Sequence, residues 1–235
     1  MTDIYDKDAK LLEAIRLEID ADPELYLGKT KPLKAADLVF MATIIQAYSY
    51  ADLNGRLIID HIRHAAFGPE KQNAGRLHDA QVFAKLQEAA GLLPDGKMKE
   101  GIIRAASTLA LHVIQRHHFA HWAIRRVKGH DVFVFYTYNA KEAEKRLGQK
   151  VEPGEIIYGA VGRKTLRAEL KKIDGHASYL AAAAVHIFKH LENWKNHFAE
   201  QKAVEQAAKY DAGKYKKGAK GPPVDGDRAD EVADH

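Results

Sequence analysis

Apolar residues along the first half of the chain recur at the three- and four-residue spacing of amphipathic helices. The first helix begins in "DKDAKLLEAIRLEI" and is closed by Pro23, and the second is long. The second predicted helix spans about Leu33 to about Ala66, with Gly55 as its weak point. The third spans about Asp79 to Ala90, and the fourth spans Met98 to Gly129. This half of the chain is therefore predicted to be helical.

The hydrophobic period changes after Gly129. "DVFVFYTY" is rich in aromatic and β-branched residues, which favours a strand, and "GEIIYGAV" is its expected hairpin partner after the short helical insert "AKEAEKRLG". A last long helix is expected from near Thr165 to about Tyr210, with a bend at Asp174-Gly175. We predict an all-α fold, an antiparallel bundle of about five helices with a small β-hairpin between the last two long helices.

Composition narrows the protein class. The chain has 235 residues, 46% of them hydrophobic, which suits one helical domain over 1–210, and the Gly/Pro-rich, charged segment 211–235 is predicted to be a disordered tail. The absence of cysteine excludes disulfides and cysteine-based zinc sites. No apolar run reaches the roughly 20 residues of a membrane span, and no signal-peptide core is visible. We expect a cytoplasmic protein without a cofactor.

Candidate chemistry gathers in "QRHHFAHWAIRR", near the end of the fourth predicted helix. From Lys99 to Lys128 there are six basic residues and one acidic residue. Histidine exchanges protons near neutral pH, and arginine is a permanent cation suited to phosphate. The segment indicates chemistry on a phosphate ester, while a basic, solvated helix face is the alternative.

A helical projection places His117 inside the apolar arc that begins with Ile102, and His121 at its margin. Arg116 lies just beyond the opposite margin, and His118 points outward. A histidine on such an arc is often a hydrogen-bonded core residue. Zinc binding by paired histidines four residues apart, as at 117 and 121 or at 186 and 190, is a further alternative, but a third ligand is missing and no metal is predicted.

The segment Arg116 to His121 resembles the Arg-polar-x3-His motif of the HEPN superfamily, in which histidine is allowed directly after the arginine. The setting is similar too, since an apolar helix leads into the motif, a strand follows, and a long helix closes the fold. The likeness covers roughly residues 5 to 205. It implies a helical bundle that dimerises with its two motifs facing each other. It also implies a metal-independent endoribonuclease, or else a catalytically silent module that binds RNA or a partner protein.

RNA supplies its own nucleophile, the 2′-OH, so scission to a 2′,3′-cyclic phosphate needs only proton transfer and positive charge. We expect His121 as general acid or base, Arg116 as phosphate clamp and His117 as orienting or second proton-transfer group. RNA-binding residues are expected at Arg125, Arg126, Lys128 and Trp122, although burial is the commoner role of tryptophan. The expected partners are RNA, a second copy of the chain, and an inhibitory or regulatory protein. Some toxin members of the HEPN superfamily carry a tyrosine two residues after the motif histidine, which is the target of their antitoxin. This chain has Ala123 at that position, so the resemblance does not support this particular pairing.

Overall fold

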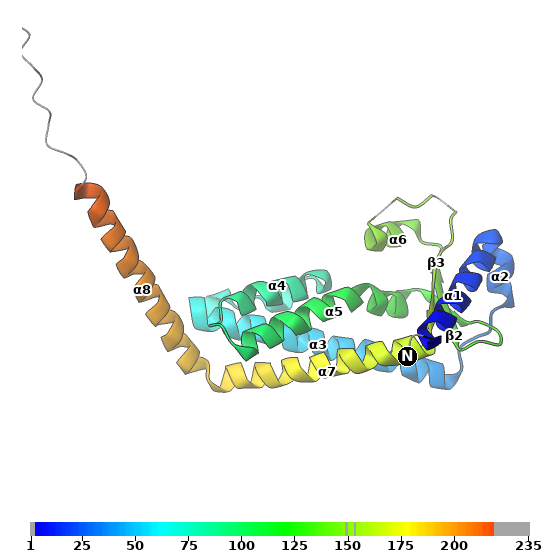
Figure 1. Ribbon diagram of the computed structural model, residues 1–235, viewed down its shortest axis with the longest axis horizontal. Coiled ribbons are helices and arrows are strands. Elements are labelled where there is room, and N and C mark those ends of the chain that lie inside the picture. The colour runs from blue at the N-terminus through cyan, green and yellow to red at the C-terminus, as the bar shows by residue number, and fades with distance from the viewer. Residues whose placement is uncertain (1–2, 149, 153, 219–235) are drawn as a thin grey trace, which may run out of the picture.

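Four helices lie side by side along the long axis of the molecule (Figure 1). They are α3 (Ala35–Phe67), α4 (Asp79–Gly91), α5 (Lys97–His121) and α7 (Arg163–Lys189). The computed structural model describes residues 3–148, 150–152 and 154–218. The facing sides of the four helices form one apolar core, and its fully buried side chains include Ile58, Phe83, Ile102 and Leu180. Burial of these stripes is the main force that stabilises the bundle.

The helix directions differ from a simple antiparallel bundle. The first turns of α3 and α7 are joined by the ion pair of Asp37 and Arg163, and their C-terminal halves by the ring contact of His61 and Phe188, so these two helices are parallel. Only α5 runs against its neighbours. This follows from the position of the sheet. The chain enters the sheet from the end of α5 and leaves it into α7, at the end of the bundle where α3 also begins (Figure 1).

The sheet has three antiparallel strands in the order β1-β2-β3, where a two-stranded hairpin was expected. Strands β2 (Val132–Thr137) and β3 (Ile157–Gly162) confirm the two predicted strands. Strand β1 (Ala123–Arg126) corrects the prediction that the fourth helix continues to Gly129. Alanine and arginine favour a helix, but pairing with β2 across a tight turn outweighs that preference.

Each face of the sheet is covered by a different part of the chain. Val132 and Val134 of β2 face α1 (Asp3–Ala21) and α2 (Pro23–Lys29), whereas Phe133 and Phe135 point to the bundle and to α6 (Ala140–Leu147). This alternation is the two-residue period of a strand that is covered on both sides. The short helix α6 confirms the predicted helical insert.

The last long helix breaks later than expected. Helix α7 passes through Asp174 and Gly175 without interruption, and the chain turns at His190 into α8 (Leu191–Gly218). The turn lets Trp194 and Phe198 pack on the main core, while the rest of α8 projects away from the bundle (Figure 1). The predicted tail, 211–235, starts inside α8, and 219–235 lie outside the described residues.

The protein is mostly helical, as predicted, but it has more helices than the five expected. Helix α2, the insert α6 and the division of the last helix account for the difference. Two 3₁₀ turns, Pro69–Lys71 and Ala74–Arg76, connect α3 to α4. No helix in the described ranges is long and apolar enough to cross a membrane.

Candidate functional site

The last two turns of α5 carry the motif, and its arginine lies against α4. Nη1 of Arg116 donates a hydrogen bond to Oδ2 of Asp79 at 3.1 Å. The other oxygen of Asp79 accepts from Nη2 of Arg56, which also donates to Asp52. A chain of alternating acids and arginines therefore crosses from α3 through α4 to α5, and it fixes Asp79 between two cations.

The two motif histidines lie one helical turn apart and contact each other. The rings of His117 and His121 are 4.3 Å apart between centroids. His117 is buried, and its Nε2 forms a hydrogen bond with Oε1 of Glu142, a residue of α6. His121 is exposed. The pair thus joins a histidine held by a carboxylate to a histidine that solvent or a ligand can reach.

A cavity of about 460 Å³ opens beside the motif, between α4 and α5. It is lined by Arg116 and His117 from α5 and by His78 and Asp79 from the start of α4. Asp79 and Glu142 are not among the predicted site residues, because they lie 37 and 25 residues away in the sequence from the side chains that they contact. Only the folded arrangement of α4 and α6 brings these acids to the motif.

His118 and Trp122 lie on the side of α5 that faces α6 and the sheet. The prediction that His118 points outward is wrong, since 7% of the residue is exposed and its ring packs against Trp122 and Phe135. The sheet and α6 cover a face that a helix projection alone leaves open. Trp122 is 6% exposed and packs with Ala143 and Val151, so it has its commoner, buried role in this structure.

The predicted RNA-binding arginines lie on β1, away from the cavity. Arg125 donates to the hydroxyl of Thr30 at 3.3 Å. Arg126 forms ion pairs with Asp37, which is fully buried, and with Asp131 at the surface. Arg163 also binds Asp37, so the carboxylate connects the starts of α3 and α7 to β1. Such a desolvated charge is tolerated because it is paired and hydrogen-bonded on both oxygens.

Lys128 lies two residues beyond the end of β1, in the turn to β2, and is exposed. It is separated from the cavity by the length of β1. The structure therefore places Arg116 and His117 at one cavity, with His121 in contact with His117, and it places Arg125, Arg126 and Lys128 at a second location.

Other titratable groups near the motif have structural contacts. Burial, with the nearby charge of Asp52, raises the pKa of Tyr48, whose hydroxyl donates to the carbonyl of Leu109 at 3.3 Å. Tyr48 therefore stays protonated at neutral pH. On α3, Asp60 accepts a hydrogen bond from the backbone N–H of Ala74 at 2.9 Å. Among the described residues no cluster of three or more His, Cys, Asp or Glu side chains could hold a metal ion.

No protein-family model, no curated protein and no solved structure matches this chain.

Proposed function

We propose that the protein is a metal-independent endoribonuclease of HEPN type that cuts RNA to leave a 2′,3′-cyclic phosphate. The observation that carries the proposal is the arrangement at the end of α5, where Arg116 and His117 line one cavity and His121 stacks on His117 at an exposed position. A permanent cation and two imidazole rings therefore lie within one turn and a half of helix.

The roles follow from exposure and contacts. His121 is the histidine that can reach a substrate, so it transfers protons, either from the 2′-OH or to the leaving 5′-oxygen. Arg116 neutralises the phosphorane-like transition state when a phosphate displaces the carboxylate of Asp79. His117, held by Glu142, orients His121 through the ring contact. In the reaction the 2′-oxygen forms a bond to phosphorus, the bond to the 5′-oxygen breaks, and one proton is removed while another is supplied.

The motif also supports the proposal that the active species is a dimer. Arg116 and His121 are five residues apart, so at 100° per residue their side chains project about 140° apart around α5. One chain alone does not direct both groups at one phosphate. A second motif facing the first across a two-fold axis would supply the missing group.

One observation favours a second candidate, a catalytically silent module that binds RNA or a partner protein. Arg116 and His117 both contact carboxylates, and His117 is 7% exposed. In that case the charged groups stabilise the junction of α4, α5 and α6, and the motif contributes no chemistry.

Cleavage of RNA in excess EDTA separates the two candidates. We expect the wild-type protein to cut single-stranded RNA under these conditions and to leave cyclic phosphate ends, which mass spectrometry detects. The variants His121→Ala and Arg116→Ala should each lower the rate by at least about 100-fold, because they remove transition-state interactions. His190→Ala, at an exposed histidine far from the motif, is the matched control.

The outcomes against the proposal are specific. Loss of cleavage on adding EDTA would contradict the metal-independent mechanism. Binding of RNA without cleavage by the folded protein would favour the silent module. An equal loss of helicity and activity in His121→Ala, measured by circular dichroism, would assign the histidine a structural role.

A further inference from the structure

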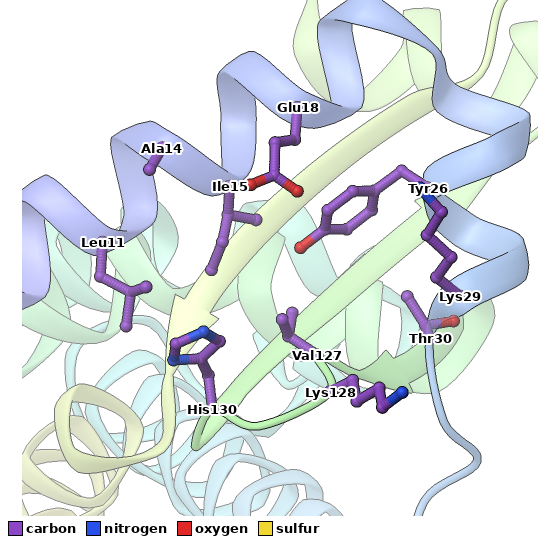
Figure 2. A pocket seen from close by; sticks show the side chains of 10 residues that line it. All are labelled: Leu11, Ala14, Ile15, Glu18, Tyr26, Lys29, Thr30, Val127, Lys128 and His130. Carbon is purple, nitrogen blue, oxygen red and sulfur yellow. The ribbon is translucent and has the colours of Figure 1, made fainter.

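Two adjoining cavities lie at the opposite end of β1 from the motif. The first, of about 210 Å³, is bounded by α1, α2 and the turn between β1 and β2 (Figure 2). The second, of about 340 Å³, lies between that turn and the segment that links α2 to α3. Val127 and His130 line both of them. We call these two cavities together the hairpin cleft. Their combined volume lies in the range of roughly 300–1,000 Å³ that is typical of small-ligand sites.

The walls of the hairpin cleft are fixed by backbone pairing. The N–H of Lys31 donates to the carbonyl of Arg126, and the N–H of Arg126 donates to the carbonyl of Lys31, both at 2.8 Å. The turn itself contains Gly129, whose φ of 81° lies in the left-handed region that glycine adopts without strain. Segments almost 100 residues apart in the sequence are thereby held as one rigid frame around the cleft.

Four exposed lysines line the hairpin cleft and give it a positive charge. They are Lys29, Lys31, Lys34 and Lys128. None of them has a salt bridge to a carboxylate within the described part of the chain, whereas Asp131, the one acid of the second cavity, is paired with Arg126. Cations that are not neutralised by the protein are available to an anionic ligand.

The first cavity adds an apolar and aromatic surface with one acceptor. Leu11, Ile15 and Val127 line it, the hydroxyl of Tyr26 points into it, and the carboxylate of Glu18 faces Tyr26 (Figure 2). Burial and the charge of Glu18 both raise the pKa of Tyr26, in keeping with a close approach of the two groups. Apolar and aromatic side chains beside one carboxylate acceptor suit a flat ring that carries N–H donors, and Glu18 would accept its hydrogen bond.

We propose that the hairpin cleft binds an unpaired nucleotide of single-stranded RNA, with the base in the first cavity and the flanking phosphates against the lysines of the second. This inference rests on the proposed ribonuclease function, since it assigns the place where the substrate strand is held. The strand β1 begins just after the motif and leads to the cleft. Because an extended chain rises about 3.3 Å per residue, Val127 lies roughly 20 Å along the chain from His121. A strand anchored in the hairpin cleft is therefore within reach of the motif.

The test measures binding, so that it does not depend on cleavage. The probe is a short, fluorescein-labelled single-stranded RNA with 2′-O-methyl groups, which lacks the attacking 2′-OH and stays intact with the wild-type chain. We expect Lys34→Glu/Lys128→Glu to raise the Kd at least about tenfold and to lower the slope of log K against log salt by about 0.7 for each lysine removed. Lys189→Glu, at the far end of α7, is the control for one such charge reversal outside the cleft and should change the Kd less than about twofold.

A second variant tests the base cavity without changing any charge. Ala14→Phe adds a ring to the exposed wall of the first cavity and fills it. It should weaken binding of the single-stranded probe at least about fivefold, the loss of one base-stacking contact, and leave binding of a duplex of the same sequence unchanged. Thermal unfolding checks that both variants are folded.

The possible results separate this inference from the proposed function. Unchanged binding by the double lysine variant, or an equal loss in Lys189→Glu, would overturn the hairpin cleft as the RNA site. Unchanged binding by Ala14→Phe would overturn the insertion of a base. If the cleft variants lose RNA binding as expected but the wild-type protein never cuts RNA, the inference stands and the ribonuclease proposal fails. If the wild-type protein cuts RNA and the cleft variants cut it at the same rate, the ribonuclease proposal stands and the hairpin cleft is not the RNA site.

Discussion

Asp79 accepts a hydrogen bond from Nη1 of Arg116 at 3.1 Å, so an acid from the first turn of α4 faces the arginine of the motif. In the proposed reaction, a phosphate takes the place of this carboxylate beside the guanidinium. It also binds Arg56, so release of Arg116 would leave Asp79 with a partner. Arg116 is therefore held in position by a carboxylate that has a second cation as a partner.

Removal of this charge should strengthen RNA binding. In Asp79→Asn the carboxylate no longer competes with phosphate, and we expect the affinity for intact, 2′-O-methyl RNA to rise about two- to fivefold at low salt. The free energy of unfolding should change by less than about 1 kcal/mol, because Asp79 is half exposed. Glu88→Gln, which removes an exposed acid from the same helix, is the control. Weaker binding by Asp79→Asn would mean that the acid serves only to position Arg116.

The sheet depends on a glycine opposite Phe135. A Cβ atom at Gly159 would lie 2.4 Å from two atoms of the Phe135 ring, which packs in turn on His118 and Trp122. We expect Gly159→Ala to lower the free energy of unfolding by about 1–3 kcal/mol in urea, because the ring must move within a packed cluster. Gly175→Ala, in the middle of α7 with open space around it, should instead raise it by about 0.5–1 kcal/mol. Equal effects of the two variants would contradict this account.

The hydroxyl of Tyr158 connects β3 to α1, and its contribution should vanish in alkali. It donates to Oδ1 of Asp20 at 2.5 Å, and burial together with this hydrogen bond raises the pKa of Tyr158 to about 12. The unfolded chain loses the proton near pH 10, so the stabilisation is complete below that value and is lost as the pH rises through about 12.

Urea unfolding of wild type and Tyr158→Phe measures this effect. At pH 9 the variant should be less stable by about 1 kcal/mol, the net value of one hydrogen bond, and the difference should shrink between pH 10 and 12. Tyr50→Phe, at an exposed tyrosine, is the control for the loss of a hydroxyl group. A difference between wild type and Tyr158→Phe that stays constant over this range would show that the hydrogen bond does not stabilise the fold.

Local pattern predicted the elements of this fold better than their arrangement. The long helix α3 and strands β2 and β3 appear where hydrophobic periodicity places them. The error at Ala123–Arg126 has a tertiary cause, because these residues pair with β2, a strand that the chain reaches through the turn at Gly129. The break at His190 has a similar cause, since Trp194 and Phe198 reach the core only if the helix turns there.

The candidate site was predictable in its motif and not in its surroundings. The spacing of Arg116, His117 and His121 along one helix is a property of the sequence, and the structure keeps them together. Their partners Asp79 and Glu142 come from other elements, and no local pattern relates them to the motif. The same reason explains the hairpin cleft, in which lysines before α3 meet a lysine after β1.

The last prediction concerns assembly into a dimer. Arg116 and His121 project about 140° apart on α5, so we expect each composite site to take its arginine from one chain and its histidine from the other. Arg116→Ala and His121→Ala should each be inactive alone. In a mixed dimer one site lacks both groups and the other retains both, so mixing the two variants should restore part of the RNA cleavage.

Light scattering and the mixing experiment together decide this point. Restored cleavage with a dimeric mass at micromolar concentration would support a shared site. No recovery on mixing, although subunit exchange is shown by differently labelled chains, would mean that both groups act from one chain or that all four copies serve one cleft. A monomer that cuts RNA at the full rate would contradict the composite site. Arg116 and His121 would then act from a single α5, on which the rings of His117 and His121 are in contact.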